Sequence, residues 1–135
     1  MADATTPLRC LVVTPEAQIT DAQVAQVILP AHDGLMGVLP GHAPMLCNLG
    51  AGLLRYRDNG GGEQVLFIDG GFGHIHKNDV TILTRQAVAK TDVNPADARE
   101  ELTRAEALPT TSLSQRQTRT AAIHRAKQLI ALAES

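Results

Sequence analysis

The chain has 135 residues and a formal net charge of −2, and 44% of its residues are hydrophobic, which suits one domain of ordinary size or a small domain with an appendage. Aromatic residues make up only 2%, so the core must be aliphatic and few rings exist on which nucleic-acid bases could stack. This composition argues against a nucleic-acid-binding protein, and no run of about 18 apolar residues predicts a membrane span.

The first 90 residues contain the turn-forming residues that separate short strands, since all 11 glycines and five of the seven prolines lie there. Strands this short and this closely spaced favour an antiparallel sandwich or barrel over a parallel sheet. Hairpin turns are expected at Asp-Asn-Gly-Gly-Gly (58–62) and Lys-Asn-Asp (77–79), where Asn and Gly tolerate positive φ. The predicted strands are 8–14, 24–29, 52–57, 63–69, 71–76 and 80–84.

Two features of this region have ordinary interpretations. Cys10 and Cys47 are isolated, which predicts free thiols in a reducing compartment. The sequence Asp-Gly-Gly-Phe-Gly at 69–73 lies between two predicted strands and lacks both the helix and the spacing of a dinucleotide site. It therefore predicts a β-bulge or a close crossing of strands.

Residues 91–135 lack glycine and are rich in Ala, Leu, Glu, Arg and Gln, which predicts helix. Asn94 and Pro95 fit the cap and first position of one helix, and Pro109 breaks the chain after it. Ser112 and Gln115 fit a capping box for a second helix. Small and aliphatic side chains form a stripe on each helix, at Ala98, Leu102, Ala105 and Leu108 and then at Ala122, Ile123, Ala126, Leu129, Ile130 and Ala133.

These two helices are expected to form an antiparallel hairpin. The predicted organisation is therefore a β domain over 1–90 and a helical hairpin over 91–135. The stripes offer little apolar area, so the hairpin should be held only marginally by its neighbours. A weakly held element can move, and this is the first indication of function.

The second helix is basic, with Arg116, Arg119, Arg125 and Lys127 against a single acid, Glu134. A solvated helix face and a docking face for an acidic partner explain this pattern equally well. A helix lying on a membrane surface is less favoured, because the apolar stripe is mostly alanine.

His42 lies in the sequence Gly-Val-Leu-Pro-Gly-His-Ala-Pro-Met-Leu at 37–46. A catalytic histidine needs an orienting partner and a nucleophile within reach, and its neighbours offer neither. Pro40 and Pro44 restrict the backbone, while Gly41 permits a tight turn. The sequence predicts a stiff, presented surface rather than a catalytic loop.

His74 and His76 are two residues apart and share one face of a predicted strand. Two histidines without a third ligand are weak evidence for a metal site, so a solvated strand face is favoured. Two alternatives stay open at this point. One is a small metal-dependent enzyme using His42, His74 and His76, and the other is a generic adaptor domain.

The stretch "GLMGVLPGHAPML" at 34–46, followed by "GAGLLRYR", "VLFIDGGFGHIHKNDVTILT" and the helical hairpin, closely resembles the ε subunit of bacterial ATP synthase, called δ in mitochondria. The pattern Gly-x-x-Gly-x-x-Pro-Gly-His-Ala-Pro-x-Leu is highly specific to that family. The resemblance extends over nearly the whole chain.

The resemblance implies a ten-stranded β-sandwich followed by two α-helices, in a non-catalytic subunit of the rotor that has no cofactor and no metal. Its partners would be the γ subunit, the c-ring and, through the hairpin, the α/β catalytic ring. It would couple proton flow to ATP synthesis and restrain ATP hydrolysis. It would lie at the cytoplasmic side of the cell inner membrane, peripheral to it through the complex.

The resemblance also implies where the contacts lie. The interface with γ and the c-ring is expected at Asp33, Leu35, Val38, Pro40, Gly41, His42 and Pro44. Contacts of the hairpin with the catalytic ring are expected at Arg116, Arg119, Arg125 and Lys127.

Two departures from the family pattern bear on these expectations. Many members have an acidic residue where Leu35 stands, so the contact here would be more apolar, or shifted to Asp33. Some bacterial members bind ATP through an Ile/Leu-Asp-x-x-Arg-Ala motif, which corresponds to 93–98 here. Asn94 replaces the Asp and Asp97 replaces the Arg, and a carboxylate there would repel phosphate, so tight ATP binding is not expected.

Overall fold

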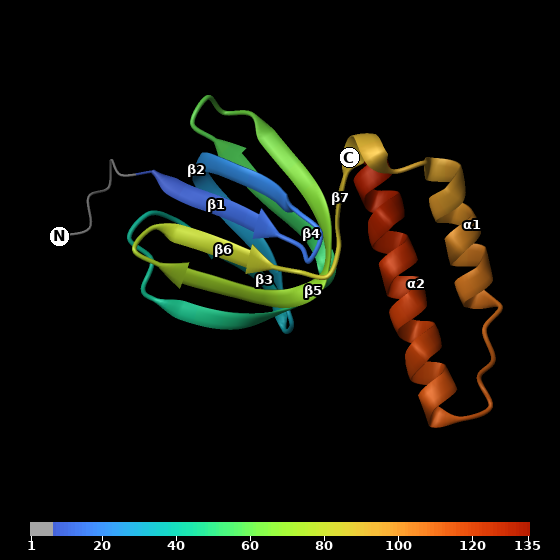
Figure 1. Cartoon of the computed structure of the whole chain (residues 1–135). Coiled ribbons are helices and arrows are strands. Elements are labelled where there is room, and N and C mark those ends of the chain that lie inside the picture. Colours follow the sequence, from blue (N-terminus) through green and yellow to red (C-terminus); the bar gives the residue numbers. More distant parts are fainter. Residues whose placement is uncertain (1–6) are drawn as a thin grey trace.

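The structure, a computed structural model, describes residues 7–135 and contains a strand-rich part followed by two long helices (Figure 1). The helices are α1, Pro95–Glu106, and α2, Leu113–Glu134, preceded by the short 3₁₀ helix η1, Lys90–Asp92. The strands are β1, Leu8–Val13; β2, Gln18–Ala31; β3, Gly34–Val38; β4, Met45–Asp58; β5, Glu63–His76; β6, Asp79–Leu83; and β7, Ala87–Ala89.

Five of these strands close into a ring. The order β1-β6-β5-β4-β2 returns to its start because β1 also pairs with β2. All neighbours in the described chain are antiparallel except β1 and β6, which are parallel. Strands β3 and β7 are additions to the ring, since β3 pairs with β2 alone and β7 with β5 alone. The expected β-sandwich or barrel class is confirmed.

The number of strands differs from the ten that the resemblance implied, because the described residues form seven. Strands β2, β4 and β5 have 14 residues each and continue without a break. The predicted strands 63–69 and 71–76 are thus both parts of β5. Strand β2 is longer than the predicted 24–29, and β3 and β7 were not predicted.

The turn signals give the hairpins that the sequence predicted. Asp58 closes the β4–β5 turn, where its carboxylate accepts hydrogen bonds from the amides of Gly60 at 3.0 Å and Gly62 at 2.9 Å. In the β5–β6 turn Lys77 and Asn78 have φ of 49° and 65°, as a two-residue hairpin turn requires.

The position of Gly71 shows why β5 contains a glycine-rich stretch. Gly71 has a φ of 110°, and a Cβ there would overlap the backbone carbonyl of Leu83 in β6. The register of β4 with β5 passes through this point without a shift, so the expected close approach of strands is confirmed rather than a bulge.

The core is aliphatic, as the composition predicted, and it has two parts. The larger lies within the sandwich and includes Leu8, Val27, Leu54 and Ile82. The smaller lies between sandwich and hairpin, and it contains Leu53, Phe67, Ala98, Leu129 and Leu132.

The hairpin has the predicted caps. The side chain of Asn94 accepts hydrogen bonds from the first turn of α1, with Pro95 at its start, and Ser112 and Gln115 form the capping box of α2. The helices are antiparallel and lie beside the sandwich (Figure 1). No helix among residues 7–135 has the length and hydrophobicity that crossing a membrane would need.

Candidate interaction site

Strand β3 is an edge strand, and it contains much of the expected interface. Its second edge has no strand partner among the described residues. Leu35 on β3 is 76% exposed, and Leu39 just beyond it is 57% exposed. Monomeric proteins rarely expose an open strand edge that has apolar side chains, because such an edge promotes association. This edge is therefore suited to binding a protein partner.

The expected interface residues lie along this one edge, although β3 separates them into two groups. Asp33 is exposed in the β2–β3 turn, before the strand, and Leu35 follows it. Gly41 and Pro44 are exposed in the β3–β4 loop after the strand, with Pro40 and His42 half-buried beside them.

Val38 does not belong to the exposed surface, which corrects one of the expected contacts. Its side chain is fully buried in the sandwich core, because side chains alternate along β3 and Val38 points inward like Met36. Val38 supports the edge from within and offers nothing to a partner.

The β3–β4 loop is held in place by a residue from another hairpin. The backbone amide of Gly41, at a φ of 85°, donates a hydrogen bond of 2.8 Å to the side-chain oxygen of Asn78. The backbone oxygen of Asn78 in turn accepts from the amide of Arg9 at 2.8 Å. The expected stiffness thus has a tertiary component, which the local sequence of the loop does not reveal.

His42 takes part in the loop rather than in a catalytic group. Its Nδ1 donates to the carbonyl oxygen of Ala43 at 2.7 Å, and its backbone amide donates to Leu39 at 3.2 Å. No nucleophile or carboxylate is hydrogen-bonded to its ring in the described part of the chain.

His74 and His76 lie on one exposed face of β5, as predicted, with ring centroids 6.0 Å apart and planes 6° from parallel. Within residues 7–135 no three His, Cys, Asp or Glu side chains are placed to share a metal ion. The three histidines of the alternative metal enzyme are therefore not brought together as a ligand set. Cys10 and Cys47 are both free.

Helix α2 is the part of the hairpin that rests on the sandwich. Leu129 and Leu132 pack against Leu53 and Phe67. One turn away from this cluster, the Nε2 of His124 donates a 2.7 Å hydrogen bond to the carbonyl oxygen of Ala51 in β4. The contact is small, which agrees with the expectation of a weakly held hairpin.

Arg125 is already paired within the chain, so its expected contact with the catalytic ring stays a prediction that requires release of the hairpin. Its guanidinium donates to Glu101 on α1 at 2.8 Å and to Gln86 of the sandwich at 2.6 Å. It also lies 3.8 Å from the carboxylate of Asp69 and 5.2 Å from the centre of the Phe67 ring. In this conformation Arg125 is an internal contact of the protein.

The other three basic residues of α2 are more accessible. Arg116 and Lys127 are exposed, and Arg119 is half-buried, with its Nε donating to the carbonyl oxygen of Glu106 at 3.3 Å. These side chains keep their charge available to an acidic partner while the hairpin is folded.

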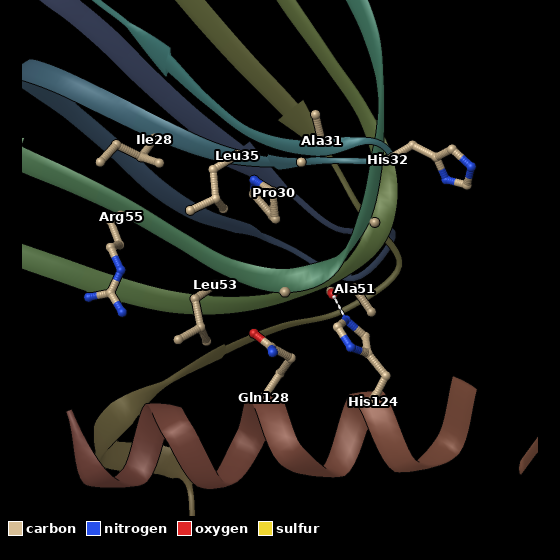
Figure 2. A pocket seen from close by; sticks show the side chains of 13 residues that line it. Ile28, Pro30, Ala31, His32, Leu35, Ala51, Leu53, Arg55, His124 and Gln128 are labelled. Atoms are coloured by element: carbon tan, nitrogen blue, oxygen red, sulfur yellow. Dashed lines mark hydrogen bonds between the residues drawn. The ribbon is translucent and has the colours of Figure 1, made fainter. Parts of the chain in front are cut away.

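A groove of about 490 Å³ lies between α2 and strands β2 and β4, and Gly34 and Leu35 of β3 also line it. Figure 2 shows Leu35 and Pro30 on one wall and His124 and Gln128 on the other, with Leu53 between them. A partner seated on the β3 edge would therefore come close to α2. This proximity could not be predicted from the sequence, since nothing local connects residue 35 with residue 124.

A second hollow, of about 240 Å³, lies at the start of α1, where the family motif for ATP would fall. It contains three acidic residues, Asp92, Asp97 and Glu101, and one cation, Arg125, which is already paired. The negative charge of this hollow is unsuited to phosphate groups.

Comparison with known proteins identifies the family. The family described as "ATP synthase, Delta/Epsilon chain, beta-sandwich domain" matches residues 7–90. The ATP synthase epsilon chain of Rhodopirellula baltica is 38% identical over 120 residues, covering 89% of this chain and 93% of that protein. The chloroplastic epsilon chain of Citrus sinensis is 37% identical over 113 residues, covering 82% and 83%.

Solved structures show the same fold. A chain of the Euglena gracilis mitochondrial ATP synthase superposes with a TM-score of 0.85 at 24% identity, covering 96% of this chain and 82% of that one. A chain of the Tetrahymena thermophila mitochondrial central stalk and c-ring gives 0.71 at 12% identity, covering 94% and 96%. With the family match over 7–90 and the relatives above, this chain belongs to the delta/epsilon chain family of ATP synthase, as a non-catalytic subunit of that complex.

Proposed function

We propose that this chain works in the central stalk of ATP synthase, where it couples proton flow through the c-ring to ATP synthesis. Residues 1–90 would bind the γ subunit and the c-ring, and residues 91–135 would form a regulatory hairpin; residues 1–6 lie outside the described part. The complex would place the chain at the cytoplasmic side of the cell inner membrane, peripheral to it.

One observation supports this proposal above the others. The open β3 edge continues into a loop that is held by the hydrogen bond between the Gly41 amide and the Asn78 side chain. Exposed apolar side chains are therefore presented on a stiff support. A subunit that transmits torque needs contacts that do not yield under load. The proposed contacts with γ and the c-ring are Asp33, Leu35, Pro40, Gly41, His42 and Pro44.

The hairpin supports the regulatory part of the proposal. It rests on the sandwich through a small apolar cluster and a few polar contacts, so its release costs little compared with unfolding the sandwich. Once released, α2 would present Arg116, Arg119 and Lys127 together with Arg125 to an acidic surface of the catalytic ring and restrain ATP hydrolysis.

Co-purification with the γ subunit alone tests the proposal. We expect a stable complex of γ with the full chain, and a weaker one when Leu35 is changed to Lys. The matched control is Leu113→Lys, an exposed leucine 64% accessible at the far end of the hairpin. The proposed interface would be contradicted if the chain did not bind γ, or if both substitutions weakened binding to γ equally.

A further inference from the structure

We propose that Arg125 is the latch of the hairpin: one side chain that fastens α2 both to α1 and to the sandwich, so that α2 is free of both only when all of these contacts break. The inference rests on the proposed function, in which the hairpin moves between two positions. It gives Arg125 a role in the folded hairpin that the exposed Arg116 and Lys127 do not have.

The contacts of Arg125 reach three separate segments. Nη1 donates to Glu101 on α1 at 2.8 Å, and Nη2 donates to Gln86, between β6 and β7, at 2.6 Å. Nε lies 3.8 Å from Asp69 on β5. The guanidinium is planar and has donors on three nitrogens, so it can serve three acceptors in fixed directions, which a lysine ammonium cannot reproduce.

The surroundings of Arg125 strengthen these contacts. Its side chain is 27% exposed and the side chain of Asp69 is 21% exposed. The guanidinium also lies over the Phe67 ring, at 5.2 Å from its centre, within the range of cation–π attraction. Partial burial reduces screening by water and salt, so this site contributes more than a pair at the surface.

Other polar contacts of the hairpin are less suited to this role. The pair of Arg99 with Glu134 joins α1 to α2 at 3.5 Å, but the two side chains are 66% and 60% exposed and, in the described chain, neither has an ion pair with the sandwich. His124 touches the sandwich, but no hydrogen bond of its ring reaches α1 in the described chain. Among residues 7–135, Arg125 is the only cation with ion pairs both to α1 and to the sandwich.

This arrangement makes the two movements of the hairpin interdependent. Separation of α2 from α1 removes the contact with Glu101, and departure of α2 from the sandwich removes the contacts with Gln86 and Asp69, so both movements act on one guanidinium. When α2 leaves, Asp69 retains Arg85 at 3.4 Å, whereas Glu101 has no other ion pair in the described structure. An acidic partner of α2 would therefore compete with Glu101 and Asp69 for the same guanidinium.

Hydrogen exchange of the isolated full chain tests the latch without any other subunit. In Arg125→Gln we expect the amides of 125–134 to exchange on the order of tenfold faster than in the unchanged protein, since charge-assisted hydrogen bonds are lost. Amides of β1 and β6 should keep their rates, which shows that the sandwich is folded. Arg116→Gln is the matched control, because Arg116 is exposed on the same helix, and it should leave the rates unchanged.

Two further variants make the test specific. Arg125→Lys, which keeps the charge, should exchange nearly as fast as Arg125→Gln, and Glu101→Gln should add little to Arg125→Gln in the double variant. Equal rates in Arg125→Gln and Arg116→Gln would overturn the latch, yet they would leave binding to γ, and so the proposed function, untouched.

Discussion

Asn78 and Gly41 are 37 residues apart in the chain, yet the side-chain oxygen of one accepts a 2.8 Å hydrogen bond from the amide of the other. This bond joins the β5–β6 turn to the β3–β4 loop. Because Asn78 also has a φ of 65°, a replacement must suit both the turn and the bond.

Asn78→Gly should free the loop while preserving the turn, since glycine accepts this φ but has no side-chain acceptor. We expect the Gly41 amide to exchange roughly threefold to tenfold faster, in line with about 1 kcal/mol for one hydrogen bond. Asn78→Asp keeps an acceptor oxygen and a residue that tolerates this φ, so it should stay close to the unchanged protein. Loss of protection in the Asp variant alone would speak against this assignment.

His42→Ala should leave ATP hydrolysis by the soluble catalytic complex unchanged, because within residues 7–135 the His42 ring is hydrogen-bonded only to its own loop. A defect is expected instead in proton-coupled ATP synthesis by the whole enzyme, through a less ordered contact with the c-ring. The two activities are measured on the same preparation before and after the soluble part is released. A fall in hydrolysis by the released part would refute the mechanical role.

ATP at millimolar concentration should not bind the isolated chain measurably. The hollow at the start of α1 has Asp92, Asp97 and Glu101 on its walls, and its one cation is paired with Glu101 at 2.8 Å. Isothermal calorimetry checks this, with Asp97→Arg as a variant that restores the residue found in ATP-binding relatives. Micromolar affinity of the unchanged chain would be incompatible with this electrostatic argument, and Arg99, Arg116 and Arg119 would then be the first residues to test.

Truncation after Lys90 should raise ATP hydrolysis by the assembled complex and leave binding to γ intact, because the hairpin is removed and the β3 edge is retained. Changing Arg116, Arg119 and Lys127 together to Ala should give part of this effect, on the order of a few-fold, since exposed pairs contribute ~0.2–1 kcal/mol each. High salt should mimic it.

The single variant Arg125→Gln is expected to behave differently from that triple variant. Arg125→Gln frees the hairpin, so the inhibited state of the complex should form more readily. The same variant also lacks one of the positive charges with which α2 would dock on the catalytic ring.

Unaltered hydrolysis after truncation, under all nucleotide conditions, would mean that the hairpin does not inhibit ATP hydrolysis here. Only the coupling role of the sandwich would then stand.

Cys10 should make the fold sensitive to alkali. Burial raises the pKa of its thiol from 9.0 to about 12, because the thiolate is poorly solvated in the core. The unfolded chain loses this proton first, so stability is fully present below pH 9 and falls as pH rises from 9 to about 12. Denaturant unfolding at several pH values should show a shallower fall for Cys10→Ala, and equal slopes would contradict the assignment.

Much of this fold follows from local sequence. Turns such as 58–62 and 77–78 need residues that tolerate positive φ, and helix starts at Asn94 and Ser112 need side chains that accept amide hydrogen bonds. These requirements act over a few residues, so they can be recognised one segment at a time. The family pattern at 34–46 indicates which fold these local elements form together.

What the tertiary structure decided concerns positions whose partners are distant in the chain. Strands β3 and β7 are short and lack a strong local pattern, and they are strands because β2 and β5 offer them a free edge. Val38 appeared to belong to a presented loop, yet the pleat of β3 turns it into the core.

The basic residues of α2 show the same division. Composition and helical spacing determined that α2 is basic and has a narrow apolar stripe. They could not distinguish Arg125 from Arg116, because both are arginines of one helix with similar neighbours. Only the packing of α2 on β5 brings Phe67, Asp69 and Gln86 to Arg125, and a guanidinium becomes a structural contact when acceptors from other segments meet it at a partly buried site.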